Sequence, residues 1–367
     1  MSHLLLDIDA AEAALNRGES LPASWYTDQS LVDEELSRIF HKTWQYVGHN
    51  SRLQNIGDYL TATLGAMPVV IVRNQLGLQG FVNVCRHRRH EVMSGCGHAK
   101  VLQCPYHAWT YDLTGSLTAA PRCDRESDFD LRDYSLIPVR VESLGPFVFA
   151  NADTNASALH AIFSPVLETI ERTGIHLDSL QLHSRDEWQS QSNWKVVIEN
   201  YLECYHCPVA HKSFSAAINV DSDKYRLEAS DWILTQIAEP RSPASGAQEA
   251  GYRFDGAIRE AQYHLLWPNC TVNINPGFPN LSIDLTLPDG PDRCRGFTEQ
   301  YFAPGVDDKW ARDLIAFNNE VGAEDDALTS SVQRGLIGGV PATGRFLPAS
   351  ERLIVHFQKL LLRQLGR

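Results

Sequence analysis

The sequence lacks the features that would place it at a membrane or on a nucleic acid. No apolar stretch reaches the roughly eighteen residues that a membrane-spanning helix requires. The N-terminal residues show no basic region followed by a long apolar core, so no secretory signal is expected. The formal net charge of −13 argues against a nucleic-acid or anionic-membrane partner, because binding to either needs clustered Lys and Arg. We therefore expect a cytoplasmic protein with neither a membrane nor a nucleic-acid partner.

Nucleotide-binding motifs and a disulfide framework are also absent. The sequence contains no G-x-G-x-x-G and no plant-type ferredoxin cysteine spacing, so no site for NAD(P)H or flavin is expected in this chain. Eight cysteines in 367 residues do not make a disulfide scaffold. Cys204 and Cys207 form a C-x-x-C, but no second C-x-x-C completes a zinc site and no thioredoxin-like context surrounds it. We expect six cysteines to be free thiols, namely Cys96, Cys123, Cys204, Cys207, Cys270 and Cys294.

Two short motifs in the first half of the chain each combine a Cys with a His. Cys85 and His87 form a C-x-H. Sixteen residues later, Cys104 and His107 form a C-x-x-H. A Rieske [2Fe–2S] centre has two Cys on one iron and two His on the other, so each half must supply one of each. A Cys₂His₂ zinc finger places both Cys in one half instead. The pattern therefore predicts a Rieske cluster, and a structural zinc ribbon is the alternative.

On these motifs the chain resembles the catalytic α subunits of Rieske non-heme iron oxygenases, from Trp44 to the last helix. The expected fold is α+β, with a small all-β Rieske domain and a catalytic domain whose antiparallel sheet is flanked by helices, of the helix-grip type. The expected divisions are N-terminal helices at residues 1–40 that pack on the catalytic domain, the Rieske domain at 41–155 and the catalytic domain at 156–367.

Hydrophobic periodicity and turn residues predict the individual elements. Helices are expected at residues 8–16, 28–40 (with Ser30 as N-cap), 158–173, 193–207, 307–336 and 350–365. Strands are expected at residues 59–64, 69–73, 81–84, 101–102, 109–111, 139–143, 147–150, 180–189, 225–229, 233–238, 264–267, 270–275, 281–287 and 293–302. The segment 240–256, which is rich in Ser, Ala and Gly, is expected to be a loop.

A second metal site is indicated by His206 and His211. Five residues on an unbroken helix correspond to about 140° of rotation, too much for both rings to face one ion. Pro208 lacks an N–H and is expected to break the helix at Cys207, so that His211 can return toward the ion. Two His and one carboxylate with open positions opposite form the Fe(II) arrangement that activates O₂.

The carboxylate of this site is expected from the segment around Asp325. The family's pattern is an Asp followed by an apolar residue three positions on and a Gln eight positions on. Asp325 satisfies it with Leu328 and Gln333, whereas Asp326 misses each by one residue. We predict Asp325 as the third ligand and retain Asp326 as the alternative.

Glu203 precedes His206 by one helical turn and has three interpretations. It could be a solvated side chain. A di-iron ligand role would need a second Glu-x-x-His, and none is found. The resemblance implies the third: Glu203 bridges the iron ligand to a cluster imidazole of a neighbouring subunit, His107 or alternatively His87, and so carries electrons between subunits. A homotrimer or a trimer-based hexamer follows from that role.

The predicted function is that of a terminal oxygenase with a Rieske cluster and a mononuclear Fe(II). It would take NAD(P)H electrons from a flavin and iron–sulfur reductase, or from a ferredoxin with its reductase, and activate O₂. Glu rather than Asp at residue 203 resembles the choline, carnitine and betaine branch, which hydroxylates or N-demethylates small quaternary ammonium compounds. Aromatic faces suit such cations, and the candidates are Trp188, Tyr201, Tyr263, Trp267 and Phe278. Ring hydroxylation of an aromatic acid is the alternative, and a Rieske electron carrier is the non-enzymatic one.

Overall fold

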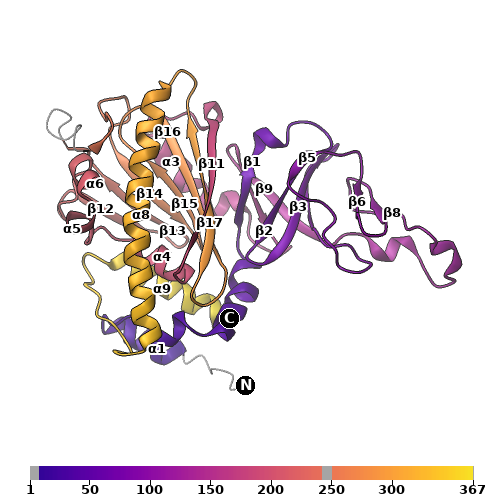
Figure 1. Ribbon diagram of the computed structural model, residues 1–367, viewed down its shortest axis with the longest axis horizontal. Coiled ribbons are helices and arrows are strands. Elements are labelled where there is room, and N and C mark those ends of the chain that lie inside the picture. The colour runs from indigo at the N-terminus through magenta and orange to yellow at the C-terminus, as the bar shows by residue number, and fades with distance from the viewer. Residues whose placement is uncertain (1–7, 242–249, 367) are drawn as a thin grey trace. The chain divides into compact units, whose positions relative to one another are not determined.

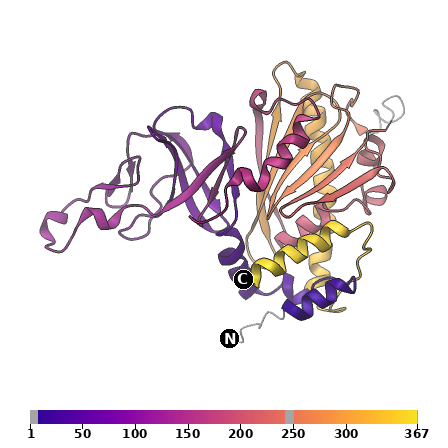
Figure 2. The same ribbon diagram turned by 180° about the vertical axis from the view of Figure 1, so that it is seen from behind.

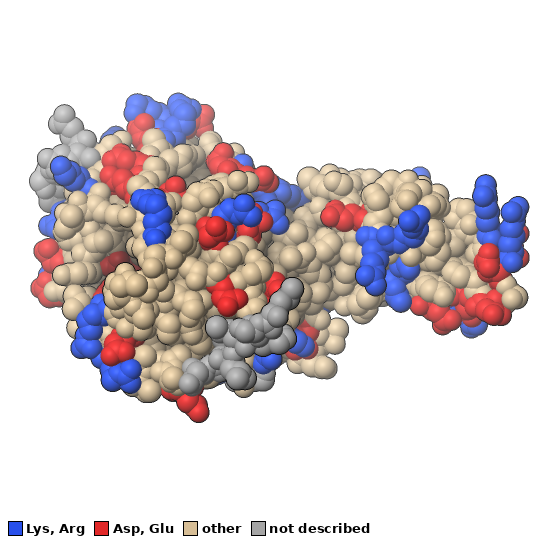
Figure 3. Space-filling model, turned by 60° about the horizontal axis from the view of Figure 1, so that its bottom comes forward, with Lys and Arg blue, Asp and Glu red and all other residues tan. Residues whose placement is uncertain are grey.

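The computed structural model describes residues 8–241 and 250–366. The chain forms two compact units, one of Phe40–Ser164 and the other of Met1–Ile39 together with Pro165–Arg367. None of the described helices combines the length and the hydrophobicity that crossing a bilayer requires. Acidic and basic side chains are interspersed over the face shown in Figure 3.

The unit formed by Phe40–Ser164 is built from β-strands (Figure 1). Seven strands form an antiparallel sheet in the order β1-β10-β9-β4-β3-β2-β5, and three more form the sheet β6-β7-β8. The strands are β1 (Gln45–His49), β2 (Asp58–Leu64), β3 (Met67–Asn74), β4 (Gly77–Val82), β5 (Cys96–His98), β6 (Leu102–Gln103), β7 (Thr110–Tyr111), β8 (Leu117–Ala119), β9 (Pro138–Leu144) and β10 (Phe147–Asn151).

Strand β3 divides the core of this unit into two clusters. Val69 and Ile71 pack into one cluster, and Val70 and Val72 pack into the other, because successive side chains of a strand point to opposite faces. All four are fully buried, which explains why this strand is a continuous apolar run. The cluster on the Val70 side also contains the two cysteines of the Rieske-type motifs.

The larger unit contains a second antiparallel sheet of seven strands, in the order β11-β17-β16-β15-β14-β13-β12. Its strands are β11 (Gln181–Ser190), β12 (Tyr225–Ala229), β13 (Ile233–Ala238), β14 (Ala261–Leu266), β15 (Cys270–Ile274), β16 (Asn280–Pro288) and β17 (Cys294–Phe302). The α-helices among the described residues are α1 (Ile8–Asn16), α2 (Gln29–Glu35), α3 (Leu159–Glu171), α4 (Trp194–Tyr201), α5 (Cys207–Ala210), α6 (Lys212–Ala217), α8 (Asp308–Gly338) and α9 (Arg352–Leu365). Helix α8 lies in front of the sheet in Figure 1, and α3 and α9 lie in front of it in Figure 2, the view from behind.

The predicted α+β architecture is confirmed, and most predicted helices and strands recur within a few residues. Strands β1, β5 and β8 were not predicted; a bulge interrupts β1, and β5 is exposed along its whole length, so neither shows a regular alternation of buried and exposed residues. The predicted N-cap Ser30 is wrong: Asp28 caps α2, and its carboxylate accepts the Ser30 N–H at 2.7 Å. The predicted loop 240–256 lies partly outside the described residues.

Candidate functional site

The loops that carry the two Cys-and-His motifs have the same backbone hydrogen bonding. In each loop the cysteine N–H donates to the carbonyl five residues on, and the cysteine carbonyl accepts the N–H four residues on. The residues in that fourth position, Arg89 and Ala108, both have positive φ, 59° and 58°. Two non-glycine residues in the left-handed region, at equivalent positions of two loops, indicate a conformation that a functional site imposes.

These loops separate the thiols from the imidazoles. Cys85 and Cys104 are 2% and 1% exposed. His87 and His107 are exposed, and their ring centroids lie 4.6 Å apart. A pair of thiols inside and a pair of imidazoles outside fits a cluster with one Cys-ligated and one His-ligated iron. The exposed imidazoles would present the second iron to an electron-transfer partner.

Tyr111 lies in the core beneath the two Cys-and-His loops. Its hydroxyl lies 3.4 Å from Cys85 Sγ and accepts the Arg86 N–H at 3.0 Å. Burial and the neighbouring Cys85 sulfur raise the pKa of Tyr111. The phenol therefore keeps its proton and can donate it to the sulfur, which would stabilise a thiolate there.

The local structure around the second site differs from the predicted helix over residues 193–207. Helix α4 starts at its N-cap Asn193 and ends at Tyr201, and His206 and His211 flank the single turn of α5. Pro208 lies in the first turn of α5, where its missing N–H costs no hydrogen bond, so the prediction that Pro208 breaks a helix is wrong. Glu203 consequently lies in the turn between the helices and not on a helical face.

The same turn contains a disulfide that the sequence did not predict. Cys204 and Cys207 are bonded, with Cα atoms 5.0 Å apart, so the prediction that both are free thiols is wrong. The Cys207 N–H donates to the Cys204 carbonyl at 3.3 Å, and this turn brings the two Cα atoms within disulfide range. The remaining thiols expected to be free are confirmed as such, namely Cys96, Cys123, Cys270 and Cys294.

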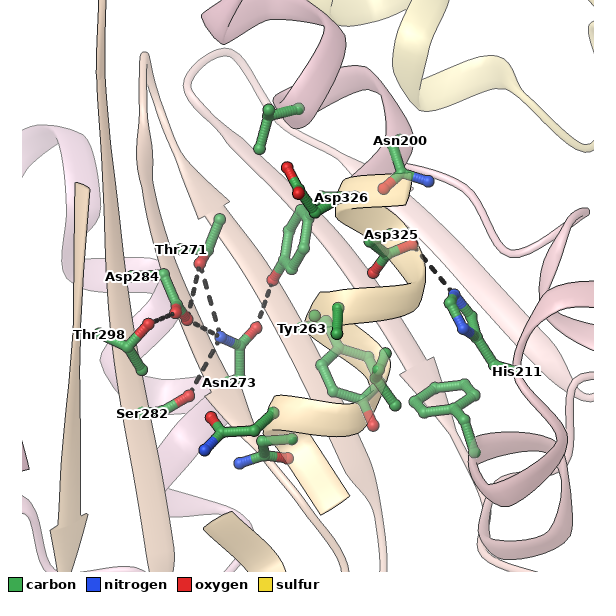
Figure 4. A pocket seen from close by; sticks show the side chains of 18 of the residues that line it. Asn200, His211, Tyr263, Thr271, Asn273, Ser282, Asp284, Thr298, Asp325 and Asp326 are labelled. Atoms are coloured by element: carbon green, nitrogen blue, oxygen red, sulfur yellow. Dashed lines mark hydrogen bonds and ion pairs between the residues drawn. The ribbon is translucent and has the colours of Figure 1, made fainter. Parts of the chain in front are cut away.

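Three potential ligand atoms converge beside this turn. His206 Nε2 and His211 Nε2 lie 3.0 Å apart, and Asp325 Oδ1 lies 3.5 and 3.0 Å from them. Figure 4 shows Asp325 on α8 directed at His211. Neighbouring ligands of a six-coordinate ion with bonds of about 2.1 Å lie about 3.0 Å apart. The spacing thus fits one face of such an ion.

The outer nitrogens of both imidazoles face carboxylates. His206 Nδ1 bonds Glu203, and His211 Nδ1 lies 2.7 Å from Glu324 Oε2. Because an ionised carboxylate only accepts, each neutral ring carries its proton on Nδ1 and directs the Nε2 lone pair at Asp325. With both rings neutral, the Nε2 atoms of His206 and His211 and the Oδ1 atom of Asp325 are three acceptors that face one point, and a cation at that point would satisfy all three. Burial opposes a charge on His206, but its bonds to Asp325 and Glu203 outweigh burial and raise its pKa to about 9. The surroundings thus favour positive charge at this point, as a metal ion would provide.

Gln333 and Asp326 have roles outside the convergent set, which accounts for the Gln eight positions after Asp325 and for the choice of Asp325 over Asp326. Gln333 is 1% exposed and accepts the Asn193 N–H at 2.9 Å, which joins α8 to the start of α4. Asp326 accepts instead from Ser190 Oγ at 2.6 Å and is not part of the convergent set found among the described residues. Glu324 was not assigned a role from the sequence, although it directly precedes Asp325.

His206, His211 and Asp325 line a cavity of about 530 Å³ in the larger unit. Trp188, Tyr201 and Tyr263 line it, as expected for aromatic residues of a binding site. Trp267 and Phe278 are not in its lining, because Trp267 packs on Phe357 and Phe278 packs on Trp310. A polar wall from the sheet was not foreseen; it consists of Thr271, Asn273, Ser282, Asp284, Thr286, Thr298 and Gln300. Figure 4 labels Thr271, Asn273, Ser282, Asp284 and Thr298 of this wall. The polar and apolar alternation from Leu281 to Leu287 is the signal that could have indicated it.

Both units match known families. Residues 43–140 match the Rieske [2Fe-2S] domain, which excludes the zinc-ribbon alternative. Residues 177–367 match the ring hydroxylating alpha subunit (catalytic domain), which excludes a pure electron carrier.

Curated relatives and solved structures agree with these matches. The carnitine monooxygenase oxygenase subunit of Acinetobacter pittii is 34% identical over 93% of this chain and 94% of its own length. The chloroplastic choline monooxygenase of Spinacia oleracea is 33% identical over 92% of this chain and 76% of its own length. The crystal structure of the quaternary ammonium Rieske monooxygenase CntA in complex with its substrate γ-butyrobetaine has a TM-score of 0.82 and 31% identity, covering 98% of this chain and 99% of that one. The chain belongs to the family of Rieske oxygenase α subunits.

Proposed function

We propose that this protein is the terminal oxygenase of a multicomponent system and that it hydroxylates or oxidatively N-demethylates a small quaternary ammonium compound. The observation that carries the proposal is a convergent His, His, Asp set that opens onto a cavity lined by aromatic faces and carboxylates. Aromatic faces attract quaternary ammonium groups, and carboxylates add a Coulombic attraction. The relatives named for carnitine and choline, both quaternary ammonium compounds, support the same substrate class.

The oxygenase uses a Rieske cluster and a mononuclear iron. We assign His206, His211 and Asp325 as the ligands of the mononuclear iron, which supplies O₂ activation when bound. Glu203 and Glu324 hold the two imidazoles in the tautomer that leaves Nε2 free. The disulfide and α8 fix the positions of these groups before substrate enters.

For the cluster we assign two pairs of ligands. Cys85 and Cys104 would hold the inner iron, and His87 and His107 the outer, exposed one. Donation from Tyr111 to the Cys85 sulfur would stabilise the reduced cluster. Electrons would reach it from NAD(P)H through a flavin and iron–sulfur reductase or a ferredoxin with its reductase.

We further propose that Glu203 passes electrons between subunits. Its carboxylate accepts the Tyr205 N–H at 2.5 Å and the His206 N–H at 3.3 Å, in addition to the His206 ring. A carboxylate has about four lone-pair sites, so a further donor can bind, and we assign this donor as His107 of the partner subunit, with His87 as the alternative. Tyr205 and Val209, which follow Glu203 in the same segment, are 62% and 85% exposed, as expected of a surface that a partner covers. Inter-subunit electron transfer is named for a CntA structure, and a homotrimer or trimer-based hexamer would provide it here.

The competing substrate class is an aromatic acid or related ring compound. An apolar ring would have to displace water from the threonines, amides and Asp284 of the sheet wall without replacing the hydrogen bonds they lose. The wall therefore favours the ammonium class.

The test is turnover by purified holoprotein with NADH, a Rieske-oxygenase reductase and O₂. Choline, glycine betaine, carnitine and benzoate are supplied separately, and products are identified by mass spectrometry. Formaldehyde in equal amount to a demethylated amine would indicate N-demethylation, and an oxygenated product without formaldehyde would indicate hydroxylation. The proposal would be overturned if benzoate gave a product and none of the three ammonium compounds did.

A further inference from the structure

One carboxylate of the sheet wall has no place in the metal site. Asp284 lies in the middle of β16, directly opposite Thr271 of β15 and Thr298 of β17. Its carboxylate accepts from Thr298 Oγ1, from Asn273 Nδ2 at 2.8 Å and from Thr271 Oγ1 at 3.4 Å. Asn273 in turn accepts from Tyr201 at 2.6 Å. These bonds hold the carboxylate in one orientation at the cavity wall.

Asp284 is deeply enclosed, yet its side chain remains accessible to the cavity. Burial raises its pKa to about 6, although the hydrogen bonds from Thr298, Thr271 and Asn273 act in the opposite direction. At neutral pH most molecules therefore carry a negative charge at this position. An ionised carboxylate in such a place normally has a cationic partner, because burying an unpaired charge is costly.

The described lining of the cavity contains no Lys or Arg that could be this partner. Four carboxylates contribute to the lining: Glu203, Asp284, Asp325 and Asp326. A ferrous ion would offset two of these charges and leave the cavity negative. In Figure 4, Asp284 lies on the sheet wall and Asp325 on the opposite side of the view, so the two carboxylates face different parts of the cavity.

We infer that Asp284 is the counter-ion of the substrate and selects an ammonium cation that carries no carboxylate. The inference rests on the proposed function and narrows it from quaternary ammonium compounds in general to cations with neutral polar substituents, such as an alcohol. Asp284 attracts the ammonium charge, and Tyr201 and Tyr263 offer aromatic faces in the same cavity. A substrate carboxylate would add another anion to a lining whose described residues include no Lys or Arg. The neutral donors and acceptors of the wall suit a hydroxyl group instead.

Three probes of nearly the same shape separate charge from size. Choline has the cation and a hydroxyl, 3,3-dimethylbutan-1-ol has the same shape without the charge, and glycine betaine has the cation and a carboxylate. Calorimetric titration of iron-loaded wild-type protein should give choline a dissociation constant at least about tenfold lower than either of the other two. This comparison needs no variant.

Asp284→Asn keeps the size of the side chain and removes its charge. The substitution should raise the dissociation constant of choline at least about tenfold and leave that of 3,3-dimethylbutan-1-ol within about twofold of the wild-type value. The difference in affinity between choline and glycine betaine should become smaller than in wild type. Asp292→Asn, which removes the same charge from a half-exposed surface position, should bind all three probes as the wild type does. Thermal melting of both variants checks that they are folded.

The inference is overturned if wild-type protein binds glycine betaine as tightly as choline, or if Asp284→Asn keeps the preference for choline over its neutral analogue. Either result would leave the proposed function intact, because an ammonium compound would still be bound. If benzoate binds and none of the ammonium probes does, the proposed function itself fails.

Discussion

Replacement of Glu324 by Gln tests whether the carboxylate behind His211 strengthens metal binding. Glu324 Oε2 lies 2.7 Å from His211 Nδ1, and the two side chains are 33% and 2% exposed. A hydrogen bond to a charged group contributes about 1.5–3 kcal/mol. Solvent reaches Glu324 and screens it, so the lower end of this range applies. We therefore expect Glu324→Gln to bind Fe(II) about tenfold more weakly, in line with other partners of metal-bound imidazoles.

The assay is competition for Fe(II) between the purified protein and a chelator of known affinity. The visible absorption of the Rieske cluster serves as an internal measure of intact protein. Glu320 provides the control because it lies one turn earlier in α8 and accepts from Ser213 Oγ at 3.0 Å. Glu320→Gln should bind Fe(II) within about twofold of wild type. The reasoning is refuted if Glu324→Gln retains wild-type affinity or if both variants lose affinity equally.

Four other perturbations address different parts of the molecule. Asp325→Ala should reduce the iron content from about three to about two per chain with the Rieske absorption unchanged, and full retention of iron would remove Asp325 from the ligand set. Tyr111→Phe, which removes the hydroxyl 3.4 Å from the Cys85 sulfur, should lower the cluster midpoint potential by roughly tens of millivolts, and an unchanged potential would show that no such hydrogen bond forms. Val209→Glu, at an 85% exposed position, should disrupt the oligomer, as measured by size-exclusion chromatography. The cluster of this variant should still be reducible, but electron transfer to the mononuclear iron should stop. An intact oligomer would show that the subunit interface lies elsewhere. Burial raises the pKa of Glu199 from 4.5 to about 7, so the folded state favours the neutral form of this side chain. As the pH rises from 4.5 to 7, the free energy of unfolding of wild type should therefore fall by up to about 3 kcal/mol relative to that of Glu199→Gln. Equal pH dependence of the two unfolding free energies would contradict this prediction.

The predictions from sequence were most accurate where the signal is local. The Cys and His motifs each lie within four residues, and most strands of both sheets show the alternation or the apolar run that sheet burial requires. Helix α8 has a buried apolar stripe in its first half and was predicted to within two residues at each end. These features depend on neighbours in the chain, so they could be read without the fold.

The features that sequence reasoning missed depend on contacts between distant segments. Asp284 joins the cavity wall because the sheet register places it between Thr271 and Thr298, and that register cannot be read from β16 alone. Pro208 was interpreted as a helix breaker because the end of α4 at Tyr201 was not foreseen, and the same error hid the disulfide between Cys204 and Cys207.

Helix α8 joins the candidate metal ligand Asp325 to the segment that carries both imidazoles. Asp325 meets the imidazole nitrogens, Glu324 holds the outer nitrogen of His211, and Gln333 accepts the N–H of Asn193 at the start of α4. These contacts come from one continuous helix, so a displacement of α8 along its axis would change all of them together. The proposed ligand set therefore depends on the position of α8 relative to the segment from α4 to α6. A substitution that weakens the packing of α8 on α4 should reduce iron retention even when every ligand is intact.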